Sequence, residues 1–156
     1  METGRILFLT GALATHGVVG YALVAGLTDA DPRLGFVFGL VPDADFLFPA
    51  TWGWPLVHRG LTHTPLFALA LVVGSYAVGR RRSLTAGRRV ALAVGLALGS
   101  HLAVDSLSPK GIDPLFPLRT SWSPGLAVHS PTATVLLWAA SIALLARSAA
   151  TEPSGR

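Results

Sequence analysis

The sequence contains no cysteine. This absence excludes disulfide bonds, thiolate metal sites and a cysteine nucleophile, so any metal site must be built from histidine and carboxylate side chains. Charged residues are scarce as well, at 13% of the chain, against about 25% in soluble domains. By contrast, 51% of the 156 residues are hydrophobic, and the mean hydropathy is +0.57. The composition indicates one membrane-embedded domain, predicted at residues 1–149, followed by a disordered tail at 150–156.

The net charge of +4 is not spread over a solvated face, because five of the 12 basic residues lie between Arg80 and Arg89. Nucleic-acid-binding domains carry their cations along one face, so no nucleic-acid partner is expected. Cytoplasmic loops of membrane proteins carry an excess of Lys and Arg. The sequence therefore predicts a plasma- or inner-membrane protein in which loop 80–89 is cytoplasmic.

A helix needs about 20 mainly apolar residues to cross a bilayer. Four segments meet or nearly meet this length: Ile6–Leu27, Leu61–Gly79, Arg88–Leu107 and Ser130–Arg147. The first is longer than the core of a signal peptide, about 7–15 residues, and we predict a retained helix. A fifth segment, Leu34–Ala50, is interrupted by Pro42 and two aspartates, which favours a re-entrant or interfacial segment. The expected fold is an all-α membrane bundle of about four transmembrane helices.

With the arginine-rich loop inside, the second span begins and the third span ends at the outer face. Residues 58–63, together with His101 and Asp105, then lie toward that face. Met1 is inside if Leu34–Ala50 does not cross the membrane and outside if it does, and the charge rule does not distinguish the two. We favour four crossings, with Met1 inside.

Ionisable residues inside a membrane are costly and are functional candidates by default. His101 and Asp105 are spaced i and i+4, so they project from one helix face. This spacing suits two ligands of one metal ion, a ligand with its hydrogen-bonded partner, a proton relay or a structural pair. Asp43 and Asp45 are expected on a turn after Pro42, where two close carboxylates repel unless a cation lies between them.

Other polar residues have ordinary explanations when each is taken alone. His16 can hydrogen-bond to a neighbouring helix, which Gly17 and Gly20 allow to approach. The sequence HRGLTH at residues 58–63 can form an interfacial turn. His129 precedes the last predicted span and is interpreted as interfacial, outside the site. The remaining polar residues are predicted to lie mostly at one level of the membrane, which favours a shared site.

The candidate metal ligands are His16, Asp43, Asp45, His58, His63, His101 and Asp105. Imidazole and carboxylate groups bind zinc or manganese. Seven candidates exceed one tetrahedral site, which predicts two or more divalent ions, most simply zinc. Such ions activate water and stabilise developing charge. Asp45 is the candidate to take a proton from that water, and Arg59 the candidate to hold an anionic substrate such as a phosphate.

Three motifs resemble those of the YdjM/YbcI-type membrane-bound metal-dependent hydrolase family. They are PDAD (42–45), HRGLTHT (58–64) and HLAVDSLSPKG (101–111), preceded by His16 and Gly20 in the HxxxG spacing of an early helix. The corresponding family patterns are PDxD, HRGxTHS and HxxxDxxTPxG. Thr64 stands where the family usually has Ser, and Ser108 where it usually has Thr; both keep a hydroxyl group. The resemblance covers most of residues 10–118.

That family is related to the zinc-dependent phospholipase C and single-strand nuclease superfamily, whose members are all-helical proteins with clustered zinc ions. The resemblance implies that the aspartates and histidines of the three motifs bind metal, with His16 beside them. A late acidic ligand of the soluble relatives has no counterpart that we can place in this chain.

These observations predict a membrane-bound metal-dependent hydrolase that cleaves a phosphoester in a lipid or lipid-linked substrate entering from the bilayer. Membrane lipids are thus the expected partners. One alternative is a small metal or proton transporter, which needs polar residues toward both faces. Another is a non-catalytic membrane protein with a structural metal ion, although one such ion needs fewer ligands than the sequence offers.

Overall fold

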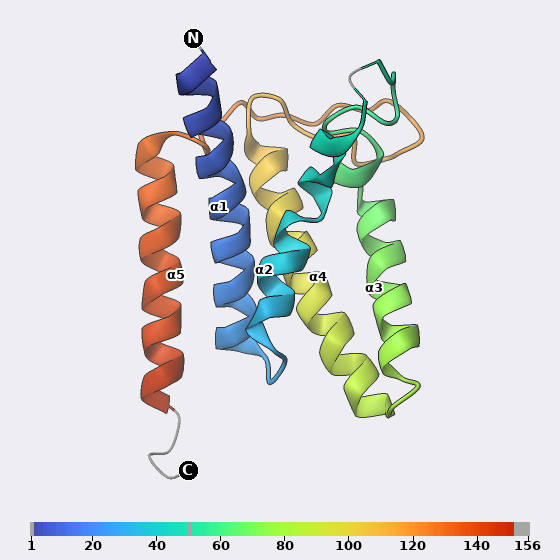
Figure 1. The fold of residues 1–156 in the computed structure, drawn as a ribbon, viewed down its shortest axis with the longest axis vertical. Coiled ribbons are helices and arrows are strands. Elements are labelled where there is room, and N and C mark those ends of the chain that lie inside the picture. The colour runs from blue at the N-terminus through green and yellow to red at the C-terminus, as the bar shows by residue number, and fades with distance from the viewer. Residues whose placement is uncertain (1, 50, 152–156) are drawn as a thin grey trace.

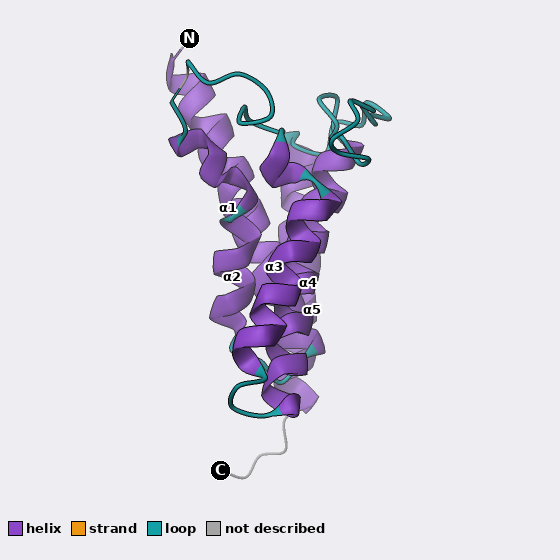
Figure 2. Cartoon of the chain, turned by 90° about the vertical axis from the view of Figure 1, so that its right-hand side faces the viewer, coloured by secondary structure: helices purple, strands orange, loops and turns teal. Residues whose placement is uncertain are grey.

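The computed structural model describes residues 2–49 and 51–151. Over these residues the chain forms five α-helices and two short 3-10 helices, with no β-strand. In chain order the elements are α1 (Glu2–Leu27), α2 (Pro32–Leu40), η1 (Pro42–Leu47), η2 (Leu61–His63), α3 (Pro65–Gly79), α4 (Leu84–Leu107) and α5 (Pro131–Thr151). The long helices lie side by side (Figure 1, Figure 2), which confirms the all-α prediction. α5 extends two residues into the tail predicted at 150–156, and residues 152–156 lie outside the described part.

In the described part of the chain, three helices are long and apolar enough to cross a membrane: Ile6–Leu27 within α1, the whole of α4, and Pro131–Ala150 within α5. α3 is apolar but has only 15 residues. It begins at Pro65 because the Thr64 side chain caps it, accepting a hydrogen bond from Phe67 N at 3.1 Å. The predicted second span, Leu61–Gly79, is therefore not confirmed as a full-length helix.

The path of the chain differs from the topology that the sequence favours. α1 starts at the end of the bundle that carries the long loops and finishes at the opposite end, where α3 and α4 are joined (Figure 1). Leu27 and Thr28 accordingly line the same surface hollow as Arg88 and Arg89. The favoured arrangement of four crossings is therefore not confirmed, because it puts Leu27 on the side opposite the arginine-rich loop, whereas the two lie together. α2 and η1 carry the chain back toward the loop-rich end.

Glycines make this return possible. Gly20 of α1 and Gly35 of α2 meet through their backbones, and a Cβ on either would collide with the carbonyl oxygen of the other. Gly39 also packs against α1, where an added Cβ would lie 2.6 Å from the carbonyl oxygen of His16. Small residues let two membrane helices approach closely. The contact holds the end of α2, and η1 after it, beside the middle of α1.

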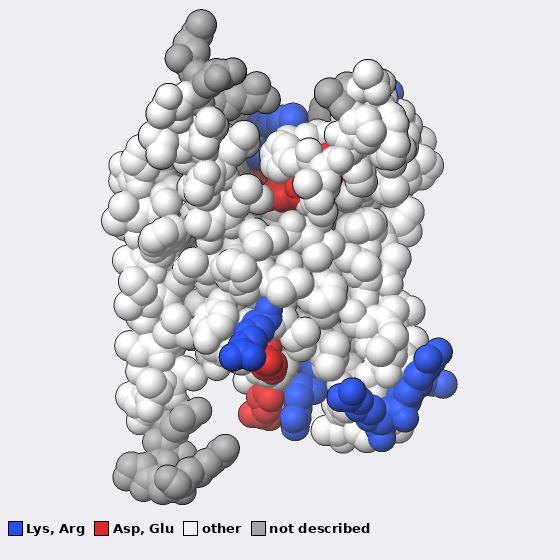
Figure 3. All heavy atoms as spheres, in the orientation of Figure 1, with Lys and Arg blue, Asp and Glu red and all other residues white. Residues whose placement is uncertain are grey.

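The apolar interior is small, and most large apolar side chains face outward. Val24, Ala93 and Leu98 are buried, whereas Leu69 of α3 and Ile142 of α5 are exposed. Figure 3 shows a surface that is uncharged over most of its height, with cations gathered at the end opposite the long loops. Such a broad apolar surface is suited to contact with lipid.

α5 is the least embedded of the three long helices. In its apolar window 6% of the residues are buried, against 28% for α1 and 33% for α4. It packs mainly on α1. Two polar contacts support this packing: Trp138 Nε1 donates to Thr15 Oγ1 at 3.0 Å, and Ser148 Oγ donates to the carbonyl oxygen of Ala25 at 3.1 Å.

Candidate metal centre

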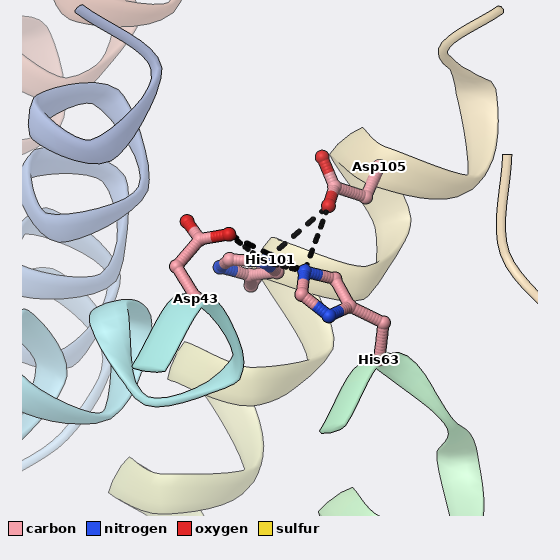
Figure 4. A group of neighbouring side chains, drawn as sticks. All are labelled: Asp43, His63, His101 and Asp105. Atoms are coloured by element: carbon pink, nitrogen blue, oxygen red, sulfur yellow. Dashed lines mark hydrogen bonds and ion pairs between the residues drawn. The ribbon is translucent and has the colours of Figure 1, made fainter. Parts of the chain in front are cut away.

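A buried group of four side chains lies where η1, η2 and α4 meet (Figure 4). Its members are Asp43, His63, His101 and Asp105. His63 Nε2 lies 3.4 Å from Asp43 Oδ1, 3.3 Å from Asp105 Oδ2 and 3.2 Å from His101 Nε2. His101 Nε2 lies 3.4 Å from Asp105 Oδ2. The predicted i, i+4 pair on α4 therefore converges with residues from two other elements.

Hydrogen bonds at the back of each imidazole fix which nitrogen faces this group. His101 Nδ1 donates to the carbonyl oxygen of Gly39 at 2.8 Å. His63 Nδ1 lies 3.1 Å from Asp45 Oδ2, to which it donates. In a neutral imidazole the other nitrogen then carries a lone pair. Both Nε2 atoms are therefore acceptors that face each other.

The donor chemistry of this group fits a divalent cation. Two imidazole lone pairs and two carboxylate oxygens come within 4.8 Å of one another. All four residues are buried, so water does not screen their mutual repulsion. Mixed nitrogen and oxygen sets of this kind bind zinc and related divalent ions, and the backing hydrogen bonds are typical of metal-ligating histidines.

A second group consists of His16, Asp105 and His129. Asp105 Oδ1 lies 3.4 Å from His16 Nε2 and 3.3 Å from His129 Nε2. The His16 ring also stacks on His101, with the ring centroids 3.8 Å apart. The structure thus places His16 next to His101 and Asp105, two of the other candidate ligands.

His129 is the residue that sequence reasoning missed. Its interpretation as interfacial and outside the site is wrong, because it contacts Asp105 and its side chain is only 11% exposed. A signal was present in the sequence, since His129 lies at the outer end of the last predicted span, on the same level as the other candidates.

The third group consists of Asp45, His58 and His63. Asp45 Oδ1 accepts a hydrogen bond from His58 Nδ1 at 2.9 Å. Asp45 Oδ2 accepts hydrogen bonds from Thr62 Oγ1 at 2.8 Å and from the backbone N of Arg59 at 3.1 Å. Both oxygens of Asp45 are therefore engaged in holding residues 58–63.

Arg59 joins the HRGLTH turn to the end of α4. Its Nη2 lies 2.9 Å from Asp105 Oδ1, and its Nη1 donates to Ser108 Oγ and, at 3.3 Å, to the carbonyl oxygen of Gly111. Its backbone has a φ of 67°, a left-handed conformation that is uncommon for residues other than glycine. The guanidinium thus neutralises part of the buried carboxylate charge.

A cavity of about 40 Å³ adjoins these groups, enough space for a water molecule. Its polar lining comprises His16, Asp43, His58, Arg59, Asp105 and His129. A larger groove of about 660 Å³ shares part of this lining and continues over Phe8, Leu9, Phe46 and Pro131 to Lys110. Partial burial, and then the nearby Arg59 guanidinium, lower the pKa of Lys110.

The family model for the YdjM inner membrane protein matches residues 11–154. The chain belongs to the YdjM inner membrane protein family. It is 33% identical over 113 residues to inner membrane protein YbcI of Escherichia coli (strain K12), a match that covers 66% of this chain and 65% of the relative. The chain thus spans just under two thirds of the length of that relative. No solved structure matches.

Membership of the YdjM family confirms the resemblance drawn from the three motifs. It also confirms the predicted multi-pass location in the inner membrane, in agreement with the three apolar helices. The names of the family and of YbcI specify a location and no reaction. Within the described residues, all seven predicted ligands belong to the three candidate metal-binding groups.

Proposed function

We propose that this YdjM-family chain is a membrane-bound metal-dependent hydrolase that cleaves a phosphoester in a lipid or lipid-linked substrate. The observation that carries the proposal is the buried group of two histidines and two carboxylates, whose Asp43 and Asp105 line a water-sized cavity that shares part of its lining with a larger, mostly apolar groove. A structural metal site needs neither the cavity nor the groove.

In this proposal, the group of four side chains in Figure 4 holds a divalent ion, zinc or manganese. When bound, such an ion lowers the pKa of a coordinated water and stabilises the charge that develops on a phosphoryl group. His63 and His101 supply nitrogen ligands whose orientation is set by Asp45 and by the carbonyl oxygen of Gly39.

Asp45 acts in this proposal by orienting its neighbours. The sequence suggested that it takes a proton from water, but both of its oxygens already accept hydrogen bonds, and it does not line the cavity. Asp43 does line the cavity. Arg59 also lines it and can face a substrate anion while it holds Asp105.

The groove supports a lipid phosphoester as the substrate class. Phe8, Leu9 and Phe46 offer an apolar wall, and Lys110 and Arg59 lie in the same groove close to the metal-binding groups. An amphiphile with an anionic head complements this pattern, because its chain meets apolar side chains while its head meets cations. The membrane location supplies such molecules from the side.

We further propose that the site end of the bundle faces outward and the arginine-rich end faces the cytoplasm, in line with the positive-inside rule. α1 then starts outside, and the chain returns to the site through α2 and η1. Irregular backbone at this depth is tolerated where protein buries it, and η1 is buried at Pro42, Asp43 and Asp45.

The test is hydrolysis by detergent-purified protein, with added zinc or manganese, of a lipid phosphomonoester and of a water-soluble phosphoester. We expect phosphate release from the lipid substrate, and a loss of at least about 100-fold in His63→Ala, as for removal of a group that supports a catalytic metal. Asp29→Asn, at the far end of the bundle, is the control and should retain activity. The transporter alternative would replace the hydrolase proposal if metal-loaded protein released no phosphate but carried metal into sealed liposomes.

A further inference from the structure

The two oxygens of Asp105 face different partners. Oδ2 lies toward His63 and His101, at 3.3 Å and 3.4 Å. Oδ1 lies toward His16 and His129, at 3.4 Å and 3.3 Å. A carboxylate whose oxygens point into two separate donor sets has the arrangement of a bridging ligand.

The Arg59 guanidinium, 2.9 Å from Asp105 Oδ1, does not block this second set. A carboxylate oxygen has two lone-pair sites and can accept a donor and a cation together. Arg59 is also tied to the loop after α4, through Ser108 and Gly111. His16 and His129 approach Oδ1 from α1 and from the segment before α5, which leaves the two imidazoles as candidate ligands beside the guanidinium.

The third group, Asp45, His58 and His63, is a weaker candidate for a separate metal site. Its three members include His63, whose Nδ1 donates to Asp45 while its Nε2 faces the first group. A neutral imidazole has one lone pair and can serve only one of these groups as a ligand. Asp45 Oδ2 moreover already accepts from Thr62 and the backbone of Arg59, and His58 uses its Nδ1 to donate to Asp45 Oδ1.

His129 stands at the junction between the site and the least embedded helix. The next residue, Ser130, caps α5 by accepting a hydrogen bond from Ala133 N at 3.2 Å. Before it, Leu126 N donates to the carbonyl oxygen of Leu107, at the end of α4, at 2.8 Å. The His129 ring lies against Phe8 and His16 of α1, with centroid distances of 6.2 Å and 5.7 Å.

We propose that His129 is a ligand of a second divalent ion, held together with His16 and Asp105, and that this ion fastens the start of α5 to α1 and α4. The proposal rests on the metal-dependent site of the proposed function and goes beyond it in giving α5 a metal-controlled position. Because α5 begins beside the groove that contains Pro131 and His129, its position determines the shape of the substrate entrance.

The first test is the zinc content per chain of detergent-purified protein, measured by elemental analysis. We expect two ions in the wild type, one in His129→Ala, and two again in His129→Glu, because a carboxylate is also a zinc ligand. The affinity of the second ion should fall by at least about 10-fold in His129→Ala. His129→Ala that retains two ions would overturn this proposal alone. Wild-type protein that is folded and metal-free would overturn the proposed function as well.

The second test measures the position of α5 directly. The chain has no cysteine, so spin labels can be attached at Val135→Cys on α5 and Leu69→Cys on α3, both of which are exposed. We expect a narrow distance distribution with zinc, a broad one after chelation, and a broad one in His129→Ala with or without zinc. Trp138→Phe removes a different tie of α5 and should keep the zinc response. A wild-type distance distribution that does not change with zinc would overturn the proposal that the second ion holds α5 in place.

Discussion

The two ends of the bundle carry their charges in opposite ways. At the arginine-rich end, Asp29, Arg88 and Arg89 are exposed around an open hollow. At the site end, Asp43 and Asp105 are 7% and 1% exposed and are surrounded by histidines and by Arg59. Exposed ion pairs contribute about 0–1 kcal/mol, whereas losing one partner of a buried pair costs about 3–5 kcal/mol. Charged residues at the arginine-rich end are thus expected to contribute little to stability, whereas those at the site end are expected to contribute several kcal/mol.

Replacing Asp105 with Ala should have the largest effect. It removes the partner of Arg59 and the carboxylate common to two metal-binding groups. We expect a destabilisation of about 3–5 kcal/mol, because a buried guanidinium loses its counter-charge, together with loss of bound metal. Asp29→Ala, at the other end, should change stability by less than about 1 kcal/mol. Thermal unfolding in detergent measures both, and equal effects of the two variants would refute the contrast.

Metal should stabilise the site end selectively. Zinc at 100 times its dissociation constant adds about 2.7 kcal/mol to the folded state, which for a chain of this size raises Tm by about 5–10 °C. The rise should disappear on chelation and should be smaller in His63→Ala, since His63 belongs to the group in Figure 4 but not to the second group. Differential scanning fluorimetry with a zinc titration measures it. A zinc-dependent rise of the same size in His63→Ala would show that the stabilising zinc binds outside this group.

The glycine contact between α1 and α2 positions the segment that returns the chain from the arginine-rich end to the site end. Gly35→Ala places a methyl group against the carbonyl oxygen of Gly20, and overpacking of this kind costs about 1–3 kcal/mol. Because α2 leads into η1, metal affinity should fall with stability. Gly74→Ala on α3 meets no atom within 4 Å, and should be neutral or stabilising by about 0.5–1 kcal/mol. Unfolding midpoints in detergent compare the two, and a neutral Gly35→Ala would show that the helices can separate at no cost.

The smallest effect is expected from Lys110. It is exposed beside the groove, so its contact with a substrate anion should contribute about 0.2–1 kcal/mol. Lys110→Ala should therefore raise KM for a lipid phosphoester by about 1.4-fold to 5-fold, with kcat and metal content unchanged. Arg82→Ala, in the loop at the opposite end, is the control. Steady-state kinetics in mixed micelles would contradict this role if Arg82→Ala raised KM as much as Lys110→Ala.

The ligands on regular helices could be predicted from sequence. His101 and Asp105 share a face because helix spacing puts residues i and i+4 together, and the charge rule brought them to the level of residues 58–63. His129 could not be assigned in this way, because its position depends on a loop that folds back over the site. The sequence indicated the level of His129 in the membrane, but not its contact with Asp105.

The partner of Arg59 and the path through α2 also escaped prediction. An arginine beside two histidines suggested an anionic substrate, whereas its nearest anion in the fold is Asp105. The predicted topology depended on whether Leu34–Ala50 crosses the membrane, and its uninterrupted apolar stretch is too short to suggest that it does. In the fold, Gly20 and Gly35 bring α2 against α1 through a backbone contact, and such a contact depends on tertiary packing that composition does not reveal.

The short length of α3 has a consequence for the surrounding bilayer. Its 15 residues span only about 22 Å at about 1.5 Å per residue, against a hydrocarbon thickness of about 30 Å. In the proposed orientation α3 crosses the membrane, and lipids that flank so short a helix would then adapt by thinning the membrane locally. Headgroups on that flank would lie deeper than in the undisturbed bilayer, so a lipid phosphate would start its approach to the buried histidines from a shorter distance.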